Sequence, residues 1–259
     1  MKRIFALILA LLLLCSLVAC SKEEAEEEED IDLTVTGDGN YYNVGNATGD
    51  RFVYEIINGN EAAIVGFVSD YTPHEIVIPD VIEQCPVVEI SDAAFYYCSQ
   101  ITSVTVPSTV RKIGKMAFAG CAQLATVKFV NNASSVTEID EFAFAHCQAL
   151  SAFTMPGTVT SIGASAFYDC KSLTEVDIPV GVTALPEMAF MGCEKLVTVT
   201  GGTALTSVGN YAFRACAALT TFTVAQTVTA IGDFAFSGCT AFEAPTLGSG
   251  VTVGQFAFE

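Results

Sequence analysis

The chain has 259 residues, of which 51% are hydrophobic, 15% are charged and none is Trp. This apolar fraction is large enough to bury a core, which excludes a wholly disordered chain, and the length favours one or two domains. Eleven basic against 29 acidic residues give a formal net charge of −18, which excludes a nucleic-acid-binding surface of clustered Lys and Arg. Ten cysteines spread along a chain of this length do not indicate a compact disulfide scaffold.

The N-terminus carries the pattern of a bacterial lipoprotein export signal. Two basic residues precede an apolar stretch at residues 4–14, which is shorter than the ~20 residues of a membrane-spanning helix. Residues 17–20, Leu-Val-Ala-Cys, resemble a lipobox, a motif whose cysteine is acylated after cleavage immediately before it. We therefore predict a signal peptide over residues 1–19 and a lipid on Cys20 that anchors the mature chain to a membrane. A plain secretory signal or an uncleaved anchor is the alternative.

An acidic segment follows the lipobox, with eight of the 29 acidic residues lying between Glu23 and Asp32. Such a run repels itself and cannot bury apolar surface, so residues 20–32 are predicted to be a flexible tether. Its opening, Cys-Ser-Lys-Glu-Glu, resembles the surface-export signal of lipoproteins from the Bacteroidetes group. A simple solvated spacer fits the composition equally well. The predicted location is a membrane-anchored lipoprotein on the extracellular face.

An internal repeat of about 23 residues accounts for most of the remaining chain. Eight Ala-Phe dipeptides follow one another at spacings of 23, 26, 23, 23, 23, 23 and 22 residues, which predicts a stack of equivalent coils. Each Phe has an aliphatic residue five positions before it, and each of the first seven has a cysteine three positions after it. The phenylalanines are Phe95, Phe118, Phe144, Phe167, Phe190, Phe213, Phe236 and Phe258, and the cysteines are Cys98, Cys121, Cys147, Cys170, Cys193, Cys216 and Cys239.

One full unit, residues 159–179, reads VTSIGASAFYDCKSLTEVDIP. Its end alternates apolar and polar residues and stops at Pro179, which is typical of a short strand. The segment from Gly163 to Cys170 predicts a tight turn followed by one helical turn. Because a unit of this size cannot enclose its own apolar face, successive units must stack about 4.8 Å apart as a solenoid. Inward Leu, Val, Ile, Phe and Cys side chains would each form a file along the stack.

The repeat resembles the leucine-rich repeats of BspA-like bacterial surface lipoproteins, whose consensus is roughly VxxIGxxAFxxCxxLxxVxIP. The resemblance covers residues 88–259 and implies a repeat solenoid of leucine-rich-repeat-like coils, each with one short parallel strand and a helical turn. It also implies adhesion to host proteins or to other bacteria. We assign residues 87–259 to this solenoid, as seven units and a partial eighth.

The segment before the repeats predicts a β-rich N-terminal cap over residues 33–86. Residues 52–67 alternate in polarity and contain Asn58-Gly59, which is a hairpin signal. Residues 75–79 copy the strand end of a repeat. The cap is expected to cover the core that the first coil would otherwise expose.

The repeat cysteines are predicted to be buried free thiols that fill the core as small apolar groups. The sequence contains no CxxC pair, the usual pattern of zinc and iron–sulfur ligands, so no metal or other cofactor is expected. Stacked coils would hold neighbouring Cβ atoms about 4.8 Å apart, wider than the ~3.8 Å mean of disulfides. An anaerobic habitat is one hypothesis that reconciles free thiols with export.

No catalytic residue is predicted, so the chain is not expected to be an enzyme. His74 falls in a loop of the cap and His146 at a variable, exposed repeat position, where a dyad with Cys147 would need a nucleophile in the core. Glu175 and Asp177 form the one obvious carboxylate pair on a predicted strand face, an arrangement typical of solvated charges. No phosphate-binding or dinucleotide-binding glycine motif is present.

The outward positions of the predicted strands form a candidate binding surface. They are mostly Thr, which any exposed sheet surface favours, but strand faces are also the usual recognition surfaces of solenoids. Regular Thr files could instead match an ice lattice, although three charged residues interrupt them. The candidate residues are Ser103, Thr105, Thr126, Lys128, Thr154, Glu175, Asp177, Thr198, Thr200, Thr221 and Thr223.

Taken together, these patterns predict a lipid-anchored, cell-surface repeat protein that mediates protein–protein binding or adhesion. The expected partners are host or bacterial surface macromolecules, and the membrane through the lipid on Cys20, but not nucleic acid. A structural envelope lipoprotein without an external ligand and a glycan-handling accessory protein remain alternatives. Exposed aromatic residues would favour glycans by stacking, and the predicted strand face offers none.

Overall fold

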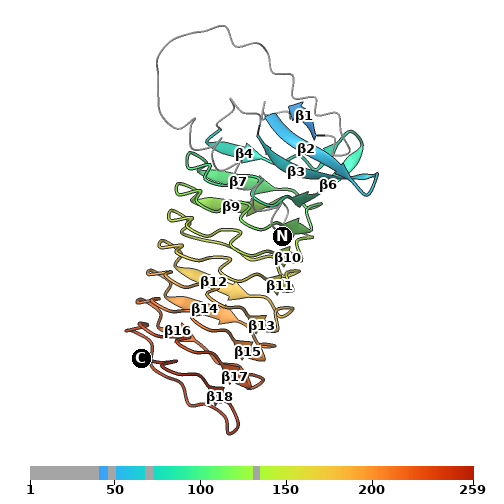
Figure 1. Ribbon diagram of the computed structural model, residues 1–259. Helices are drawn as coiled ribbons and strands as arrows, with labels where there is room; N and C mark the ends of the chain where they lie inside the picture. Colours follow the sequence, from blue (N-terminus) through green and yellow to red (C-terminus); the bar gives the residue numbers. More distant parts are fainter. Residues whose placement is uncertain (1–40, 46–50, 68–72, 131–134) are drawn as a thin grey trace, which may run out of the picture. The chain divides into compact units, whose positions relative to one another are not determined.

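The protein is described by a computed structural model at residues 41–45, 51–67, 73–130 and 135–259 (Figure 1). These residues belong to one compact unit, Thr34–Glu259. The predicted signal peptide, the lipid site at Cys20 and the acidic tether lie outside the described residues. Across the described ranges there are strands and turns but no α-helix, and no helix is long and apolar enough to cross a membrane.

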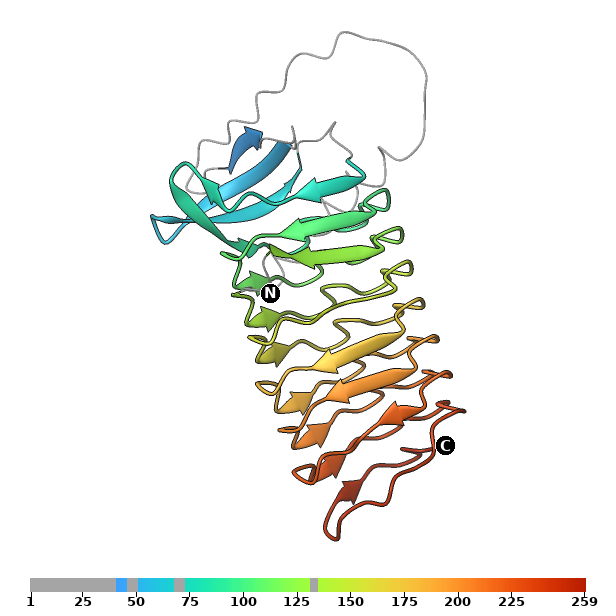
Figure 2. The same cartoon turned by 180° about the vertical axis from the view of Figure 1, so that it is seen from behind.

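The repeats form a solenoid in which each coil contributes up to two short strands to parallel ladders, as both views show (Figures 1 and 2). The first ladder contains the strands that the sequence predicts. Its members are β4 (Glu75–Val77), β7 (Ser103–Val106), β9 (Thr126–Phe129), β12 (Glu175–Ile178), β14 (Thr198–Gly201) and β16 (Thr221–Phe222). A repeat solenoid with units of about 23 residues is therefore confirmed.

The second ladder lies around the aliphatic residue five positions before each Phe, and the sequence did not predict it. After β6 (Cys85–Ile90) its strands are only two residues long. They are β8 (Lys112–Ile113), β10 (Glu138–Ile139), β11 (Ser161–Ile162), β13 (Ala184–Leu185), β15 (Ser207–Val208), β17 (Ala230–Ile231) and β18 (Thr252–Val253). Two residues are too few to show an alternating pattern, so no strand signal can be recognised here from the sequence.

The first ladder is interrupted in the middle of the repeats. The sheet β4-β7-β9 ends at an isolated parallel bridge between Thr126 and Ala152, and the sheet β12-β14-β16 begins one coil later. Stacking continues across the interruption, because the backbone N–H of Thr174 donates to the carbonyl of Ser151 at 3.2 Å. One coil therefore lacks its strand without leaving the stack.

The N-terminal strands cover the first coil of the solenoid. Strands β1 (Tyr41–Gly45), β2 (Arg51–Ile57) and β3 (Glu61–Phe67) pair in antiparallel fashion, and β3 then pairs with β6 in parallel. The short β5 (Val81–Ile82) adds an antiparallel pair to β6. The predicted hairpin at Asn58-Gly59 is confirmed, with φ angles of 53° and 77°.

The core is built from side-chain files that run from coil to coil. The eight repeat phenylalanines stack with centroid separations of 5.1 to 5.5 Å. At the cap end Phe67 continues the file, 4.8 Å from Phe95, and Phe52 packs on Phe67 at 5.4 Å. Each ring is thus covered by its neighbours, except that Phe67 and Phe258 are only half-buried.

The predicted helical turn after each Gly is wrong. In residues 165–169, the N–H groups of Ser165, Phe167 and Asp169 donate to carbonyls of the next coil at 2.8 to 2.9 Å. Ser165 and Asp169 have φ angles of 57° and 58°, and equivalent residues in the other coils are also left-handed. A positive φ every fourth residue breaks a right-handed helix, and the inter-coil bonds compensate by satisfying the backbone donors. We call this part of each coil, from two residues before to two after the repeat Phe, the turn edge.

Candidate binding surface

The side chains of the first ladder alternate between the core and solvent, as a strand with one buried face must. In β12, Val176 and Ile178 are buried, whereas Glu175 and Asp177 are exposed. The exposed positions of β7, β9, β12, β14 and β16, together with Thr154 and Thr223, form what we call the strand surface. It contains every candidate binding residue named from the sequence, all of them exposed or half-buried.

The strand surface consists of two parallel files of side chains. In the first, Ser103 aligns with Thr126 and Thr126 with Ala152, and after the interruption Glu175, Thr198 and Thr221 align in turn. In the second, Thr105 aligns with Lys128 and Asp177 with Thr200. Thr154 lies in the coil between these two pairs, and Thr223 lies in the coil after Thr200. The structure thus brings the predicted residues together on one surface.

Threonines on this surface differ from those elsewhere in the coils. Thr174 and Thr206 donate their hydroxyls to carbonyls of the preceding coil, at 3.1 and 2.9 Å, as do several equivalent threonines. Within the described ranges, the strand-surface hydroxyls make no such bond to another coil's backbone. Thr200 instead donates to the carboxylate of Asp177 at 2.6 Å, which connects two members of the surface itself.

The charges of the strand surface make no ion pair within the described ranges, unlike some of the charges elsewhere in the coils. Lys112, Lys115 and Lys171 pair with acidic residues on other sides of the coils. By contrast, Lys128 and the acidic pair Glu175 and Asp177 have no oppositely charged side chain within 4.0 Å in the described part of the chain. These charges therefore remain available to a partner.

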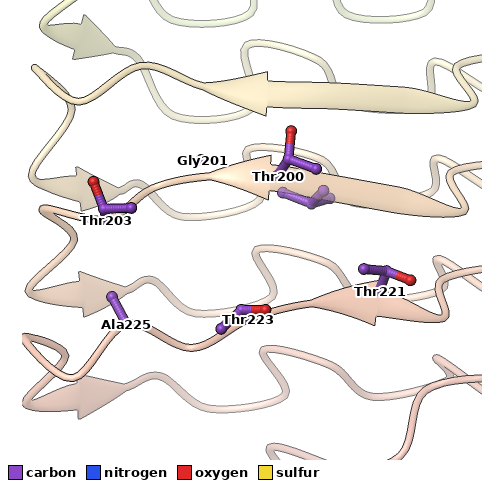
Figure 3. Close-up of a pocket in the computed structure, with 7 residues that line it drawn as sticks. Thr200, Gly201, Thr203, Thr221, Thr223 and Ala225 are labelled. Atoms are coloured by element: carbon purple, nitrogen blue, oxygen red, sulfur yellow. The ribbon is translucent and has the colours of Figure 1, made fainter.

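Two shallow depressions of about 220 and 230 Å³ lie on the strand surface. One is lined by Ala152, Phe153, Thr154, Glu175, Val176, Asp177, Thr198 and Thr200. The other is lined by Val199, Thr200, Gly201, Thr203, Thr221, Thr223 and Ala225, and Figure 3 shows these residues on two successive coils. Because both include Thr200, they are adjacent. The depression of about 230 Å³, which contains Glu175 and Asp177, is acidic. The depression of about 220 Å³ has no charged side chain in its lining and is neutral.

The repeat cysteines do more than fill space. Six of them are buried free thiols that donate to the carbonyl of the repeat Phe in the preceding coil, at 3.0 to 3.2 Å, and only Cys98 is half-buried. Interpreting them as apolar fillers was incomplete, because the thiol also satisfies a buried acceptor. Burial raises the pKa of Cys147, which leaves no thiolate nucleophile beside His146.

The two histidines belong to surface contacts. Nδ1 of His146 lies 3.2 Å from the Asp169 carboxylate, and its ring packs edge-on against Tyr168. His146 has a φ of 60°, so its position is conformationally restricted rather than unconstrained. Nδ1 of His74 contacts the carbonyl of Gln100 at 2.9 Å. No group of three or more His, Cys, Asp or Glu side chains that could hold a metal ion occurs among the described residues.

Sequence reasoning missed an aromatic row on the turn edge. Tyr211, Phe234 and Phe256 stack at 5.2 and 5.1 Å, and Arg214 lies over the first two rings at 5.6 and 5.9 Å. The sequence signal for this row was an aromatic residue two positions before the repeat Phe in each of the last three coils. It was not recognised because a helical turn would have pointed these positions elsewhere.

Comparison with known proteins agrees with this architecture. The family model described as "BspA type Leucine rich repeat region (6 copies)" matches residues 88–216 and 160–259. A leucine-rich repeat protein of T. pallidum, TpLRR, is 30% identical with a TM-score of 0.52, over 65% of this chain and 87% of that one. A leucine-rich repeat protein from Bacteroides ovatus is 26% identical with a TM-score of 0.60, over 79% of this chain. This chain spans 60% of the length of that protein. No curated protein sequence is significantly similar.

Stacked coils of about 23 residues, with parallel ladders and a continuous file of phenylalanines, define a leucine-rich-repeat solenoid. The matched residues cover about two thirds of the sequence, and the chain belongs to the family of BspA-type leucine-rich repeat proteins. The resemblance recognised in the sequence is confirmed.

Proposed function

We propose that this protein is a lipid-anchored, non-enzymatic protein of the bacterial cell surface that binds other proteins through its strand surface. The observation that carries the proposal is that threonines and charged residues make different contacts on the strand surface and elsewhere in the coils. Outside the strand surface many of these groups connect one coil to the next, whereas on it, apart from the bond between Thr200 and Asp177, they face solvent and are left for an external partner.

The charge of the surface indicates the kind of partner. Glu175 and Asp177 place two exposed carboxylates side by side on β12, within the acidic depression. A host or bacterial surface protein with a basic region would be attracted to them, and such exposed charges mainly affect the rate of association. The strand surface exposes no aromatic ring in the described residues, so a glycan-handling role has little support.

Binding is tested by screening the full chain against purified extracellular-matrix proteins and intact bacteria. We expect capture at micromolar concentration that weakens as salt is added. If neither matrix proteins nor bacteria are bound at that concentration, the adhesive function fails and a structural role in the envelope is favoured. Cleavage of the protein by protease added to intact cells supports surface exposure, and complete protection contradicts it.

Anchoring is tested by replacing Cys20 with Ala. Without an acceptor for the lipid, the variant is expected to leave the membrane fraction and to lose incorporation of a labelled fatty acid. Cys15→Ala is the matched control, because Cys15 precedes the expected cleavage point and that variant should stay membrane-bound. Membrane association of the Cys20 variant, together with an unlabelled wild type, would contradict the anchor.

A further inference from the structure

The strand surface carries its charges in a fixed order. Lys128, Thr154 and Asp177 occupy equivalent positions of three successive coils. The phenylalanines of those coils are separated by 5.3 and 5.5 Å, so the lysine and the acidic pair project from sites about 10 Å apart. Unlike the ion pairs elsewhere in the coils, this cation and these anions are too far apart to neutralise each other.

The neutral depression lies beyond the acidic pair in the same direction. It extends over β14 and the coil of β16, where Val199, Gly201 and Ala225 contribute to its lining (Figure 3). Its far wall is one to two coils from Asp177, and therefore about 5 to 10 Å away. Along the axis of the solenoid the surface thus presents a cation, an acidic pair and a small neutral depression.

A polyproline II helix matches this spacing. It rises about 3.1 Å per residue with three residues per turn, so every third side chain points the same way and recurs each ~9.3 Å. A β-strand fits less well, because its same-face side chains recur each ~6.8 Å. A polyproline II segment is also extended in the free state, which lowers the entropy lost on binding.

We propose that the strand surface binds a polyproline II segment of its partner, laid across the strands along the solenoid axis. An acidic residue of the segment pairs with Lys128, the third residue after it is basic and pairs with Glu175 and Asp177, and the third after that is apolar and occupies the neutral depression. This proposal rests on the proposed function, since it names the ligand of the same surface.

Synthetic peptides test the order of the groups. The matched peptide is a nine-residue proline host with Glu, Lys and Leu at positions 2, 5 and 8, and the control exchanges Glu and Lys. Binding to the full chain is measured by fluorescence anisotropy. Reversing two exposed charge pairs is worth about 1.4 kcal/mol, so the matched peptide should bind about tenfold more tightly. Bound in the opposite direction and shifted by one turn, the control can satisfy both charges, but its Leu then lies outside the neutral depression. The lost apolar contact is worth about as much as the charge pairs, so the expected preference is about the same in either orientation.

The matching variant of the protein is Lys128→Glu with Glu175→Lys and Asp177→Lys, which should reverse the preference between the two peptides. Unfolding by urea checks that the variant remains folded. Equal binding of both peptides, binding of neither at millimolar concentration, or a preference that the variant leaves unchanged would overturn the proposal. If matrix proteins or bacteria are still captured in that case, the proposed function stands and only the polyproline II ligand is lost.

Discussion

The turn edge and the strand surface belong to the same coils but use their residues differently. On the turn edge, alternate backbone donors bond to the next coil, and at its C-terminal boundary each buried thiol donates to a carbonyl of the preceding coil. On the strand surface, the backbone forms the ladder while the outward side chains mostly face solvent. The turn edge therefore specifies the stack, and the strand surface is free to differ from coil to coil.

This difference means that one set of residues specifies the fold and another set is available for recognition. Residues that repeat every 23 positions, such as Phe167 and Cys170, are those that contact other repeat residues in a neighbouring coil. Residues that break the repeat on the strand surface, such as Lys128 and Glu175, contact nothing that the fold needs. Changes at the turn edge should thus affect stability, and changes at the strand surface should affect binding alone.

The largest expected effect is destabilisation at alkaline pH by the buried thiols. Burial raises the pKa of Cys121, Cys147, Cys170 and Cys193, whereas unfolded thiols ionise near pH ~8.5. Above that pH the folded state binds more protons than the unfolded state, so stability falls as pH rises. Each thiol lowers the free energy of unfolding by about 1.4 kcal/mol per pH unit, and these four together lower it by about 5 kcal/mol per pH unit.

The measurement is the free energy of unfolding in urea between pH 7.5 and 10 under reducing conditions. At pH values below the pKa of the thiols in the unfolded chain, the stabilisation by the buried neutral thiols should be fully present and independent of pH. Cys170→Ala should reduce the alkaline slope by about 1.4 kcal/mol per pH unit, because one titrating thiol is removed. A stability curve that is flat to pH 10 would show that the thiols are not buried in their neutral form.

The second effect is the loss of a ring from the phenylalanine file. Phe167 lies between Phe144 and Phe190, at 5.5 and 5.3 Å, and is fully buried. Phe167→Ala should cost about 3–5 kcal/mol in the free energy of unfolding, as expected for a large core truncation. Phe258→Ala should cost less, because Phe258 is half-buried and stacks on Phe236 alone among the described phenylalanines. Equal losses at the two positions would argue against a stacked file.

A smaller effect distinguishes the two kinds of threonine. The hydroxyl of Thr206 donates to the carbonyl of Thr183 at 2.9 Å, whereas Thr198 faces outward from β14 without such a bond. Thr206→Val should therefore cost about 0.5–1 kcal/mol, and Thr198→Val close to nothing. Thermal unfolding of both variants checks this. Destabilisation by Thr198→Val as large as that by Thr206→Val would contradict the assignment of Thr198 to recognition.

The sequence predicted the repeat length, the inward files and the strands of the first ladder, because each produces a periodic pattern of apolar residues. It failed at the turn edge, where Ala-rich segments such as residues 164–168 favour a helical turn by local propensity. Bonds to the next coil override that propensity, and no local pattern reports them. The thiol–carbonyl bonds were missed for the same reason, since they join residues 26 positions or more apart.

The strand-surface residues were identified correctly as outward-facing, because alternation with buried residues fixes the direction of each side chain. Their relations across coils could not be read from one strand. The contact between Thr200 and Asp177, the missing strand near Ala152 and the adjacent depressions depend on how neighbouring coils stack. The sequence therefore predicted which residues lie on the surface, but not the contacts between residues of neighbouring coils.

The measurement that tests this separation most directly combines binding and stability in one variant, Glu175→Gln with Asp177→Asn, which removes both charges and leaves an amide oxygen to accept the bond from Thr200. The full chain and the variant are compared by urea unfolding and by the rate of association with a basic matrix protein that the wild type captures. Glu83→Gln with Glu187→Gln removes the same charge from two exposed residues away from the strand surface, neither of which forms an ion pair within the described ranges, and serves as the control. We predict unchanged unfolding midpoints, and slower association for the strand-surface variant alone, with added salt slowing the wild type to the same rate. A shifted unfolding midpoint, or equal slowing by the control, would contradict the claim that folding and recognition use different side chains of the same coils.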